Sequence, residues 1–243
     1  MAGHSKWSNI KHRKGRQDAK KGKIFTKLSK EIFQAVRDGG SDPTTNTNLR
    51  LAIEKAKQAN MPNDNIERTM NKALGNLEGV TYEEIIYEGY APHGVAIYVQ
   101  ALTDNKNRTA AEVRLAFNKN NGNLGESGCV AFMFARKGCL VFEKDRELDE
   151  EIVLLEAIEA GAEDVKTGTD AFEVITAPED FEHVKQLLPN AIDSKSIFAE
   201  VTMLPSTTTT VNDEQAADII QLIETLEDND DVQNVYHNLE ITN

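Results

Sequence analysis

Apolar residues recur at helical spacing along the chain between residues 24 and 75. In three successive segments they return every three or four positions, which is the pattern of an amphipathic helix. The expected inward positions are Ile24, Phe25, Leu28, Ile32, Ala35 and Val36, then Leu49, Ala52, Ile53 and Ala56, and finally Ile66, Met70 and Leu74. The pattern predicts a small domain of three helices.

Residues of known helix-end preference separate these segments. Gly39-Gly40 predicts the end of the first helix, because glycine adopts the left-handed conformation of a C-terminal cap. Asp42-Pro43 predicts an N-cap and the first residue of the second helix. We expect Asn63 to cap the third helix and Gly75 to end it.

Beyond Gly79 the apolar spacing shifts towards two, which is the period of a strand. The segments "EEIIYEGY" and "GVAIYVQALT" are predicted strands joined by the turn "APHG". A helix is predicted for "NRTAAEVRLAFNKNNG", with Val113, Ala116 and Phe117 inward, and a third strand for "CVAFMFAR".

A second, shorter cycle of strands and helices follows. Its segments are the strand "CLVFEKD", the helix "DEEIVLLEAIEAGA", the strands "EDVKT" and "AFEVITA", the helix "PEDFEHVKQLL" and the strand "AEVTMLP". This βαββαβ order predicts a ferredoxin-like fold.

The helix "NDEQAADIIQLIETLEDN" and the strand "DVQNVYHNLE" remain, and they have no sheet of their own. We expect them to return to the sheet that begins near residue 84, through a linker at Thr207–Thr210. The predicted fold class is therefore α+β and multidomain. The predicted domains are a basic arm with the helical domain (1–80), a discontinuous α+β domain (81–134 with 205–243), and an inserted ferredoxin-like domain (135–204).

Charge is unevenly distributed along the chain. The 243 residues carry a formal net charge of −13, yet residues 1–80 carry +8 and residues 81–243 carry −21. Eight of the first 23 residues are Lys or Arg. An asymmetry of this size indicates that the basic part contacts a polyanion.

The basic arm has the composition of a nucleic-acid ligand. Seven charges fall within 13 residues, at Lys11, Arg13, Lys14, Arg16, Lys20, Lys21 and Lys23, interleaved with His12. Such clusters neutralise phosphates and release counterions, and Trp7 can stack on a base. Phosphate contacts carry little sequence information, so we expect weak sequence specificity. A solvated tail without a partner is the alternative.

Three other motifs favour structural roles. "GNLGESG" (Gly122–Gly128) fits neither a dinucleotide-binding nor a Walker loop and is interpreted as a turn. In "TDNKNRT" (Thr103–Thr109), Asp104 or Asn107 is expected to cap a helix while Arg108 pairs with the acidic surface; a partner contact there stays open. "EDNDD" (Glu227–Asp231) is interpreted as a solvated loop.

Catalytic, metal-binding and membrane-spanning patterns are missing from the sequence. The five histidines are scattered, and no His-x-x-His, Cys-x-x-Cys or Gly-x-Ser-x-Gly motif occurs. We therefore predict no catalytic residue, no metal, no cofactor and no small-molecule substrate. The chain has no long apolar segment or secretory signal, and Cys129 and Cys139 are expected to be reduced, so a cytoplasmic protein is predicted.

Four long motifs resemble one family throughout. They are "MAGHSKWSNIKHRKGRQDAKKGKIFTKLSKEI", "DPTTNTNLRLAIEKAKQANMPNDNIERT", "YEGYAPHGVAIYVQALTDNKNRTAAEVR" and "GNLGESGCVAFMF". In this order they are similar to the YebC/PmpR family, whose mitochondrial relatives are translational activators of cytochrome oxidase. In "GYAPHG" the family more often has glycine at the positions of Ala91 and His93.

The resemblance implies a non-enzymatic, three-domain, nucleic-acid-binding protein. Its binding role falls on the matching basic positions from Lys6 to Lys30, which adds Lys6, Lys27 and Lys30 to the residues above. The family is generally described as DNA-binding transcriptional regulators. A rival interpretation within the family is a translation factor that binds ribosomal RNA, contacts ribosomal proteins and relieves stalling at proline-rich sequences. A protein-interaction scaffold that uses the acidic domains is a third possibility.

Overall fold

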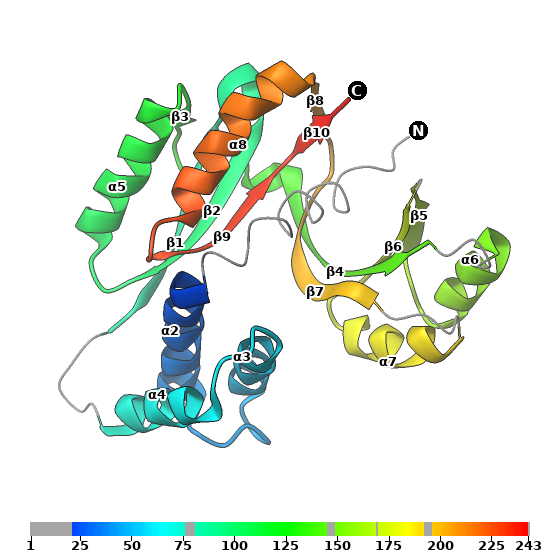
Figure 1. The fold of residues 1–243 in the computed structure, drawn as a ribbon, viewed down its shortest axis with the longest axis horizontal. Coiled ribbons are helices and arrows are strands. Elements are labelled where there is room, and N and C mark those ends of the chain that lie inside the picture. Colours follow the sequence, from blue (N-terminus) through cyan, green and yellow to red (C-terminus); the bar gives the residue numbers. More distant parts are fainter. Residues whose placement is uncertain (1–20, 76–80, 145–148, 169, 192–195, 243) are drawn as a thin grey trace. The chain divides into compact units, whose positions relative to one another are not determined.

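The protein has the α+β architecture that the sequence predicts (Figure 1). The computed structural model describes residues 21–75, 81–144, 149–168, 170–191 and 196–242. Within these ranges the chain forms two compact units. The first contains residues 21–75, 81–129 and 214–235, and the second contains the described residues of 130–213 and 236–242.

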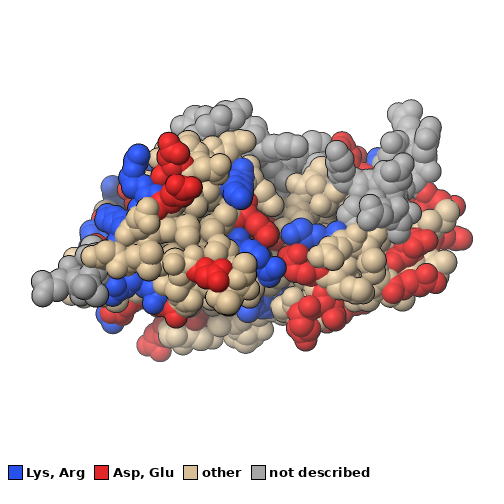
Figure 2. Space-filling view, turned by 90° about the horizontal axis from the view of Figure 1, so that it is seen from below, with Lys and Arg blue, Asp and Glu red and all other residues tan. Residues whose placement is uncertain are grey.

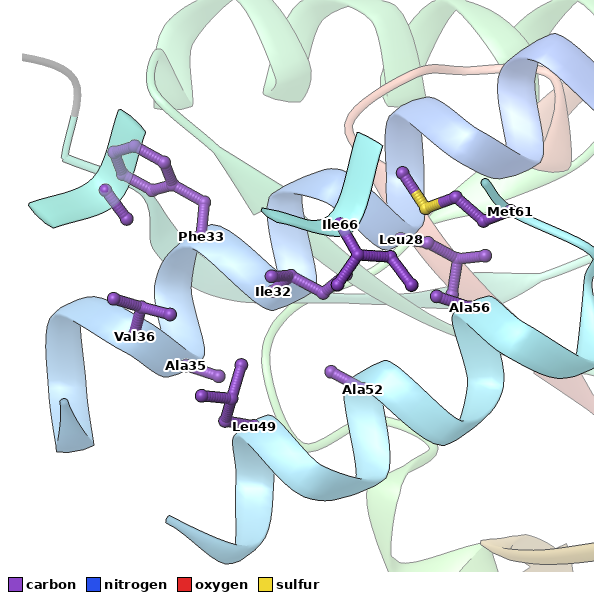
Figure 3. Close-up of a cluster of buried hydrophobic side chains, with 11 residues drawn as sticks. Leu28, Ile32, Phe33, Ala35, Val36, Leu49, Ala52, Ala56, Met61 and Ile66 are labelled. Atoms are coloured by element: carbon purple, nitrogen blue, oxygen red, sulfur yellow. The ribbon is translucent and has the colours of Figure 1, made fainter. Parts of the chain in front are cut away.

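The first unit begins with three helices, α2 (Lys21–Gly39), α3 (Thr47–Gln58) and α4 (Asn63–Gly75). Their predicted inward faces meet in one core, where Ile32, Leu49 and Ala56 are fully buried (Figure 3). Leu74 is an exception, because it is 53% exposed and Ala73 is buried in its place.

The ends of these helices confirm one prediction and correct another. Gly40 follows α2 with a left-handed φ of 84°, and its N–H donates to the carbonyl of Val36. The predicted N-cap at Asp42 is wrong, because Asp42 instead accepts hydrogen bonds from Thr44 in a turn. The cap of α3 is Asn46, whose Oδ1 accepts from the Leu49 N–H and whose Nδ2 donates to carbonyls at the end of α2.

The first unit also contains most of a four-stranded sheet. The strands are β1 (Glu83–Tyr90), β2 (Ala96–Thr103), β3 (Asn123–Leu124) and β9 (Val232–His237), in the order β3-β1-β2-β9. Helices α5 (Lys106–Lys119) and α8 (Asp213–Glu227) lie side by side over the sheet (Figure 1). Since β9 lies next to β2, the last helix and strand return to this sheet as predicted.

The turn between β1 and β2 contains a non-glycine residue with left-handed backbone. It contains a short 3-10 helix, η2 (Pro92–Gly94), in which His93 has a φ of 64°. Left-handed backbone of this kind favours glycine. Although it is not glycine, His93 adopts this conformation, and its Nδ1 lies 3.4 Å from Nε2 of Gln215.

The second unit has the predicted ferredoxin-like plan. Its elements are β4 (Phe134–Glu143), α6 (Glu150–Glu159), β5 (Asp164–Thr167), β6 (Ala171–Thr176), α7 (Phe181–Ala191) and β7 (Ser196–Pro205). The strand order is β5-β6-β4-β7, and all neighbours are antiparallel. Leu140, Phe172, Val184 and Leu188 form the core between the sheet and its two helices.

The start of β4 corrects the predicted strand boundaries. "CVAFMFAR" is not a strand of the first sheet, because Ala131–Met133 form a 3-10 turn, η3, and β4 begins at Phe134. Gly138 does not interrupt the strand, since it pairs with Thr176 on one side and Val201 on the other. A Cβ at Gly138 would lie 2.1 Å from Oγ1 of Thr176 and 2.7 Å from the Phe181 ring, so this glycine allows close packing within a continuous strand.

The C-terminal strand is also divided. After β9, a separate strand β10 (Leu239–Ile241) pairs in parallel with β8 (Thr209–Val211). Part of the predicted linker at Thr207–Thr210 therefore belongs to a strand. One compact unit contains both the helical domain and the first sheet, whereas the sequence predicts them as separate domains. The domain boundaries therefore stay a prediction.

Candidate nucleic-acid interface

The predicted nucleic-acid-binding residues fall into two groups. Lys6, Trp7, Lys11, His12, Arg13, Lys14, Arg16 and Lys20 lie outside the described residues. Lys21 is the first residue of α2, but its side chain is also outside the description. The side chains of Lys23, Lys27 and Lys30 are described, and they show how the helix that follows the basic arm is held.

These three lysines contact the C-terminal end of α8. Their spacing of four and three residues places them on one face of α2. Lys23 Nζ donates to the carbonyl of Asp228 at 3.0 Å, Lys27 Nζ to that of Glu227 at 2.6 Å, and Lys30 Nζ to that of Asp230 at 2.8 Å. The last carbonyls of a helix have no partner within the helix and carry its negative dipole end, so ammonium groups stabilise them.

Asp231 is the centre of this contact. Its Oδ1 accepts a hydrogen bond from Lys30 Nζ at 2.6 Å, in an ion pair whose side chains are 13% and 5% exposed. Its Oδ2 accepts from Arg108 Nη2 at 2.6 Å and from the Thr109 hydroxyl at 2.8 Å. The predicted solvated loop at Glu227–Asp231 is therefore wrong for Asp231, which joins α2, α5 and the turn before β9.

The charge state of Asp231 follows from these contacts. Burial alone raises the pKa of its carboxyl group, but the hydrogen bonds from Lys30, Arg108 and Thr109 outweigh burial and lower the pKa to about 2. The hydrogen bonds to Asp231 and Asp104 in turn raise the pKa of Arg108. Asp231 is therefore ionised at neutral pH, and its charge is compensated within the protein.

A second contact joins the helical domain to the first sheet. The Tyr82 ring meets the Phe33 ring edge-on, with centroids 5.5 Å apart, and Lys30 Nζ lies 5.7 Å from the Tyr82 centroid. Burial, together with the negative charges of Asp104 and Asp231, raises the pKa of the Tyr82 hydroxyl. Neighbouring residues of α2, Lys30 and Phe33, thus make ionic and apolar contacts that hold the helix against Asp231 and Tyr82.

The segment Thr103–Thr109 has mainly a structural role. The cap of α5 is Asn105, which accepts from the Arg108 N–H, and neither Asp104 nor Asn107 as predicted. The expected pairing of Arg108 with acidic residues is confirmed by its contacts with Asp104 and Asp231. No local signal in the sequence identifies Asp231 as the partner of Lys30 and Arg108, because these donors lie more than 100 positions away from it in the chain.

The glycine-rich segment Gly122–Gly128 has a structural role, as interpreted, although Asn123–Leu124 within it form strand β3 and only the rest is a turn. The backbone N–H of Gly128 donates to Oε1 of Glu88 at 2.6 Å, and the N–H of Gly125 donates to the Glu88 carbonyl at 2.8 Å. Glu88 is only 4% exposed. The loop's N–H groups are thus used by β1, which leaves them unsuited to cradle a phosphate.

Basic side chains elsewhere in the helical domain are interspersed with acidic ones. Residues 21–75 contain ten basic and six acidic residues, so their net charge is modest. Arg50, Lys57, Arg68 and Lys72 are exposed on α3 and α4. On the face shown in Figure 2, Lys and Arg lie among Asp and Glu and form no continuous basic patch. The highest density of positive charge is therefore in the sequence before Lys23.

The described residues offer neither a metal site nor a membrane-spanning helix. Within the described ranges, no group of three His, Cys, Asp or Glu side chains is arranged to hold a metal ion. None of the helices in that part of the chain combines the length and apolar character needed to cross a membrane.

The protein is therefore a multidomain α+β protein with a three-helix domain that follows a basic segment. Comparison with family models identifies the family to which it belongs. The family model "TACO1/YebC protein N-terminal domain" matches residues 5–76, and the model "TACO1/YebC second and third domain" matches residues 82–239. The chain therefore belongs to the TACO1/YebC family.

Relatives of similar length share most of the sequence. A "Probable transcriptional regulatory protein" of Natranaerobius thermophilus is 57% identical over 243 residues, covering 99% of this chain and 97% of the relative. "Probable transcriptional regulatory protein YrbC" of Bacillus subtilis is 55% identical over 241 residues, covering 98% and 99%.

A solved structure has the same fold. The crystal structure of the conserved hypothetical protein Aq1575 from Aquifex aeolicus matches with a TM-score of 0.78 and 48% identity, covering 93% of each chain.

Proposed function

We propose that this protein is a non-enzymatic, nucleic-acid-binding regulator of gene expression, and that DNA bound during transcription regulation is its target. The observation that carries this proposal is the basic segment, with seven positive charges within residues 11–23 of a chain whose net charge is −13. The names of the relatives, which describe probable transcriptional regulatory proteins, support the transcriptional role.

The proposed interface is narrower than the sequence alone predicts. It consists of Lys6, Trp7, Lys11, His12, Arg13, Lys14, Arg16, Lys20, Lys21 and Lys23. Lys27 and Lys30 are left out, because their ammonium groups already bind the end of α8 and Asp231. Lys23 also donates to the Asp228 carbonyl, but it is kept because its side chain is 47% exposed.

A second candidate function is binding of ribosomal RNA by a translation factor. The observation that favours it is the net charge of −21 on residues 81–243. So much negative charge opposes close approach of these residues to a long duplex, since charges interact strongly within about 8–10 Å. An arm of 20 residues can extend by about 65–70 Å and reach RNA in a crevice while the acidic part stays away.

The experiment that tests the proposal compares the two targets directly. Cell lysate is fractionated on a gradient at moderate salt, and the purified full chain is titrated with promoter DNA and with unrelated DNA. Deletion of residues 2–20 removes the arm and leaves α2 complete. The matched control is Arg68→Ala/Lys72→Ala, which removes two exposed positive charges from α4.

The outcomes separate the two functions. Discrimination above about a hundredfold for one promoter, near 2.7 kcal/mol, with no ribosome association supports the transcriptional role. Co-migration with ribosomes that disappears on deletion of residues 2–20, but not in the α4 control, supports the translational one. If the deletion changes neither DNA binding nor co-migration, the nucleic-acid proposal is wrong.

A further inference from the structure

Helix α6 of the ferredoxin-like unit exposes apolar side chains on its outer face. Ile152, Leu154, Leu155 and Ile158 are 52%, 45%, 57% and 56% exposed. The core side of the helix is formed instead by Val153 and Ala157, which are buried. Single exposed leucines are common, but four on one ten-residue helix form a patch of the kind that marks an interaction site.

Acidic residues surround this patch. Residues 149–163 contain six acidic residues and no basic one. Glu150 pairs with Lys144 and Glu163 with Lys137, whereas Glu151, Glu156 and Glu159 have no ion-pair partner among the described residues. Figure 2 shows Asp and Glu side chains gathered around uncharged residues at its right-hand end, where α6 and α7 lie.

The negative charge around the α6 patch limits which kind of molecule can bind there. A second copy of the chain placed against the same helix would bring two sets of unpaired carboxylates together, and like charges oppose such a contact. Nucleic acids and anionic membranes are repelled for the same reason. A positively charged protein segment gains both from burial of the apolar side chains and from pairing with the surrounding carboxylates.

We propose that α6 is a docking surface for a basic, amphipathic segment of a partner protein. The apolar side chains of that segment pack on Ile152, Leu154, Leu155 and Ile158, and its Lys or Arg side chains pair with Glu151, Glu156 and Glu159. This is the arrangement of an amphipathic helix on an apolar surface, with charge setting the choice of partner. The proposal does not depend on which nucleic acid the basic arm binds.

The test uses the full chain and two synthetic peptides of identical Leu and Lys composition. One peptide places Leu at positions i, i+3, i+4 and i+7 of each repeat, and the other has the same residues in an order without an apolar face. We expect the patterned peptide to bind at least tenfold more tightly, as measured by fluorescence anisotropy. A patterned Leu/Glu peptide should not bind.

Variants of the full chain test whether α6 causes the difference in affinity between the two Lys peptides. Leu155→Gln/Ile158→Gln keeps helix-forming residues and should remove the tenfold preference. The matched control is Leu115→Gln, because Leu115 is 51% exposed on α5 of the other unit, and it should keep the preference. Glu151→Gln/Glu156→Gln/Glu159→Gln should weaken binding of both Lys peptides and reduce its salt dependence.

Four results would overturn the proposal. They are no binding of the patterned Lys peptide, equal affinity for the two Lys peptides, equal losses in the Leu115 and Leu155/Ile158 variants, and self-association of the wild type that the Leu155/Ile158 variant abolishes. The last result, seen by sedimentation, would identify a second copy of the chain as the occupant. Circular dichroism checks that each variant keeps its helix content.

Discussion

Lys30 and Asp231 lie 201 positions apart in the chain, yet the Lys30 ammonium is 2.6 Å from Oδ1 of Asp231. Arg108, Thr109 and Thr103 donate hydrogen bonds to the other oxygen of the same carboxylate. The helix that follows the basic arm is thereby fastened to the turn between α8 and β9. Lys27 and Lys30 continue the run of basic residues in the sequence, but in the folded protein they fasten α2 to the end of α8 and to Asp231.

Asp231→Asn should destabilise the first unit. The substitution removes the negative charge that Lys30 and Arg108 share, and we expect a loss of about 2–3 kcal/mol of unfolding free energy. Urea denaturation followed by circular dichroism measures it. Asp230→Asn is the matched control, because the neighbouring Asp230 side chain is exposed, and it should change stability by less than about 0.5 kcal/mol. Equal effects of the two substitutions would contradict the role of Asp231.

The contribution of Asp231 should depend on pH in a defined direction. An unfolded aspartate titrates near 3.9, whereas the pKa of folded Asp231 is about 2. A pKa that is lower in the folded state means that the stabilisation is complete above about pH 4–5 and is lost as the pH falls through about 2. The gap in urea midpoint between wild type and Asp231→Asn should therefore be constant from pH 7 to 5 and shrink below pH 4. A gap that grows on acidification would contradict the prediction.

Removal of charges from the arm should weaken nucleic-acid binding without changing the fold. For Lys11→Ala/Arg13→Ala/Lys14→Ala/Arg16→Ala we expect a similar loss of affinity for all sequences. If the wild type neutralises about five to seven phosphates, log K against log salt has a slope of about −4 to −6, and the variant's slope is shallower by about 3–4. Arg68→Ala/Lys72→Ala is the control. A wild-type affinity that does not respond to salt would exclude an electrostatic interface.

Lys30→Met should separate stability from binding. It leaves Asp231 with Thr103, Arg108 and Thr109 as partners but without the Lys30 charge, and we expect about 1–3 kcal/mol lower unfolding free energy. The affinity of the folded protein for nucleic acid should stay within about twofold of the wild type, as measured by anisotropy well below the denaturation midpoint. If affinity instead falls as far as in the arm variant, Lys30 belongs to the interface and the narrower interface proposed above is wrong.

Gly138→Ala should destabilise the ferredoxin-like unit. Its new Cβ would lie 2.1 Å from the Thr176 hydroxyl and 2.7 Å from the Phe181 ring, and relief of that overlap requires displacement of packed neighbours. We expect a cost of about 2–3 kcal/mol, seen as a lower midpoint of thermal unfolding. Gly75→Ala is the control, because a Cβ there meets no heavy atom within 4 Å in the described part of the chain. Unchanged unfolding of Gly138→Ala would show that the strand can move away.

Most of the secondary structure is predictable because it depends on local patterns. The inward faces of α2 and α3 follow from the three- and four-residue spacing of Leu28, Ile32, Leu49 and Ala52, all of which are buried. Gly40 ends α2 because glycine adopts the left-handed conformation of a helix end more readily than other residues do. The ferredoxin-like strand order follows from the βαββαβ succession, since few topologies are compatible with short connections.

Where two local interpretations were possible, packing decided between them. The sequence predicts two separate strands, "CVAFMFAR" and "CLVFEKD", but Gly138 between them pairs with Thr176 and Val201, so β4 is continuous. Asp42 and Asn46 are both good N-cap residues, and Asn46 is the cap because its amide also reaches two carbonyls at the end of α2. Neither choice is visible in a window of a few residues.

The sequence by itself determined most of the elements, the family and the concentration of positive charge before Lys23. Only the tertiary structure decided which charged side chains remain available to a partner. Lys27 and Lys30 look like members of the basic arm, and Asp231 looks like part of a solvated acidic loop. Folding brings Lys30 and Asp231 together because a buried carboxylate is stable only when distant parts of the chain supply its counter-charges, and such a pairing has no local signature.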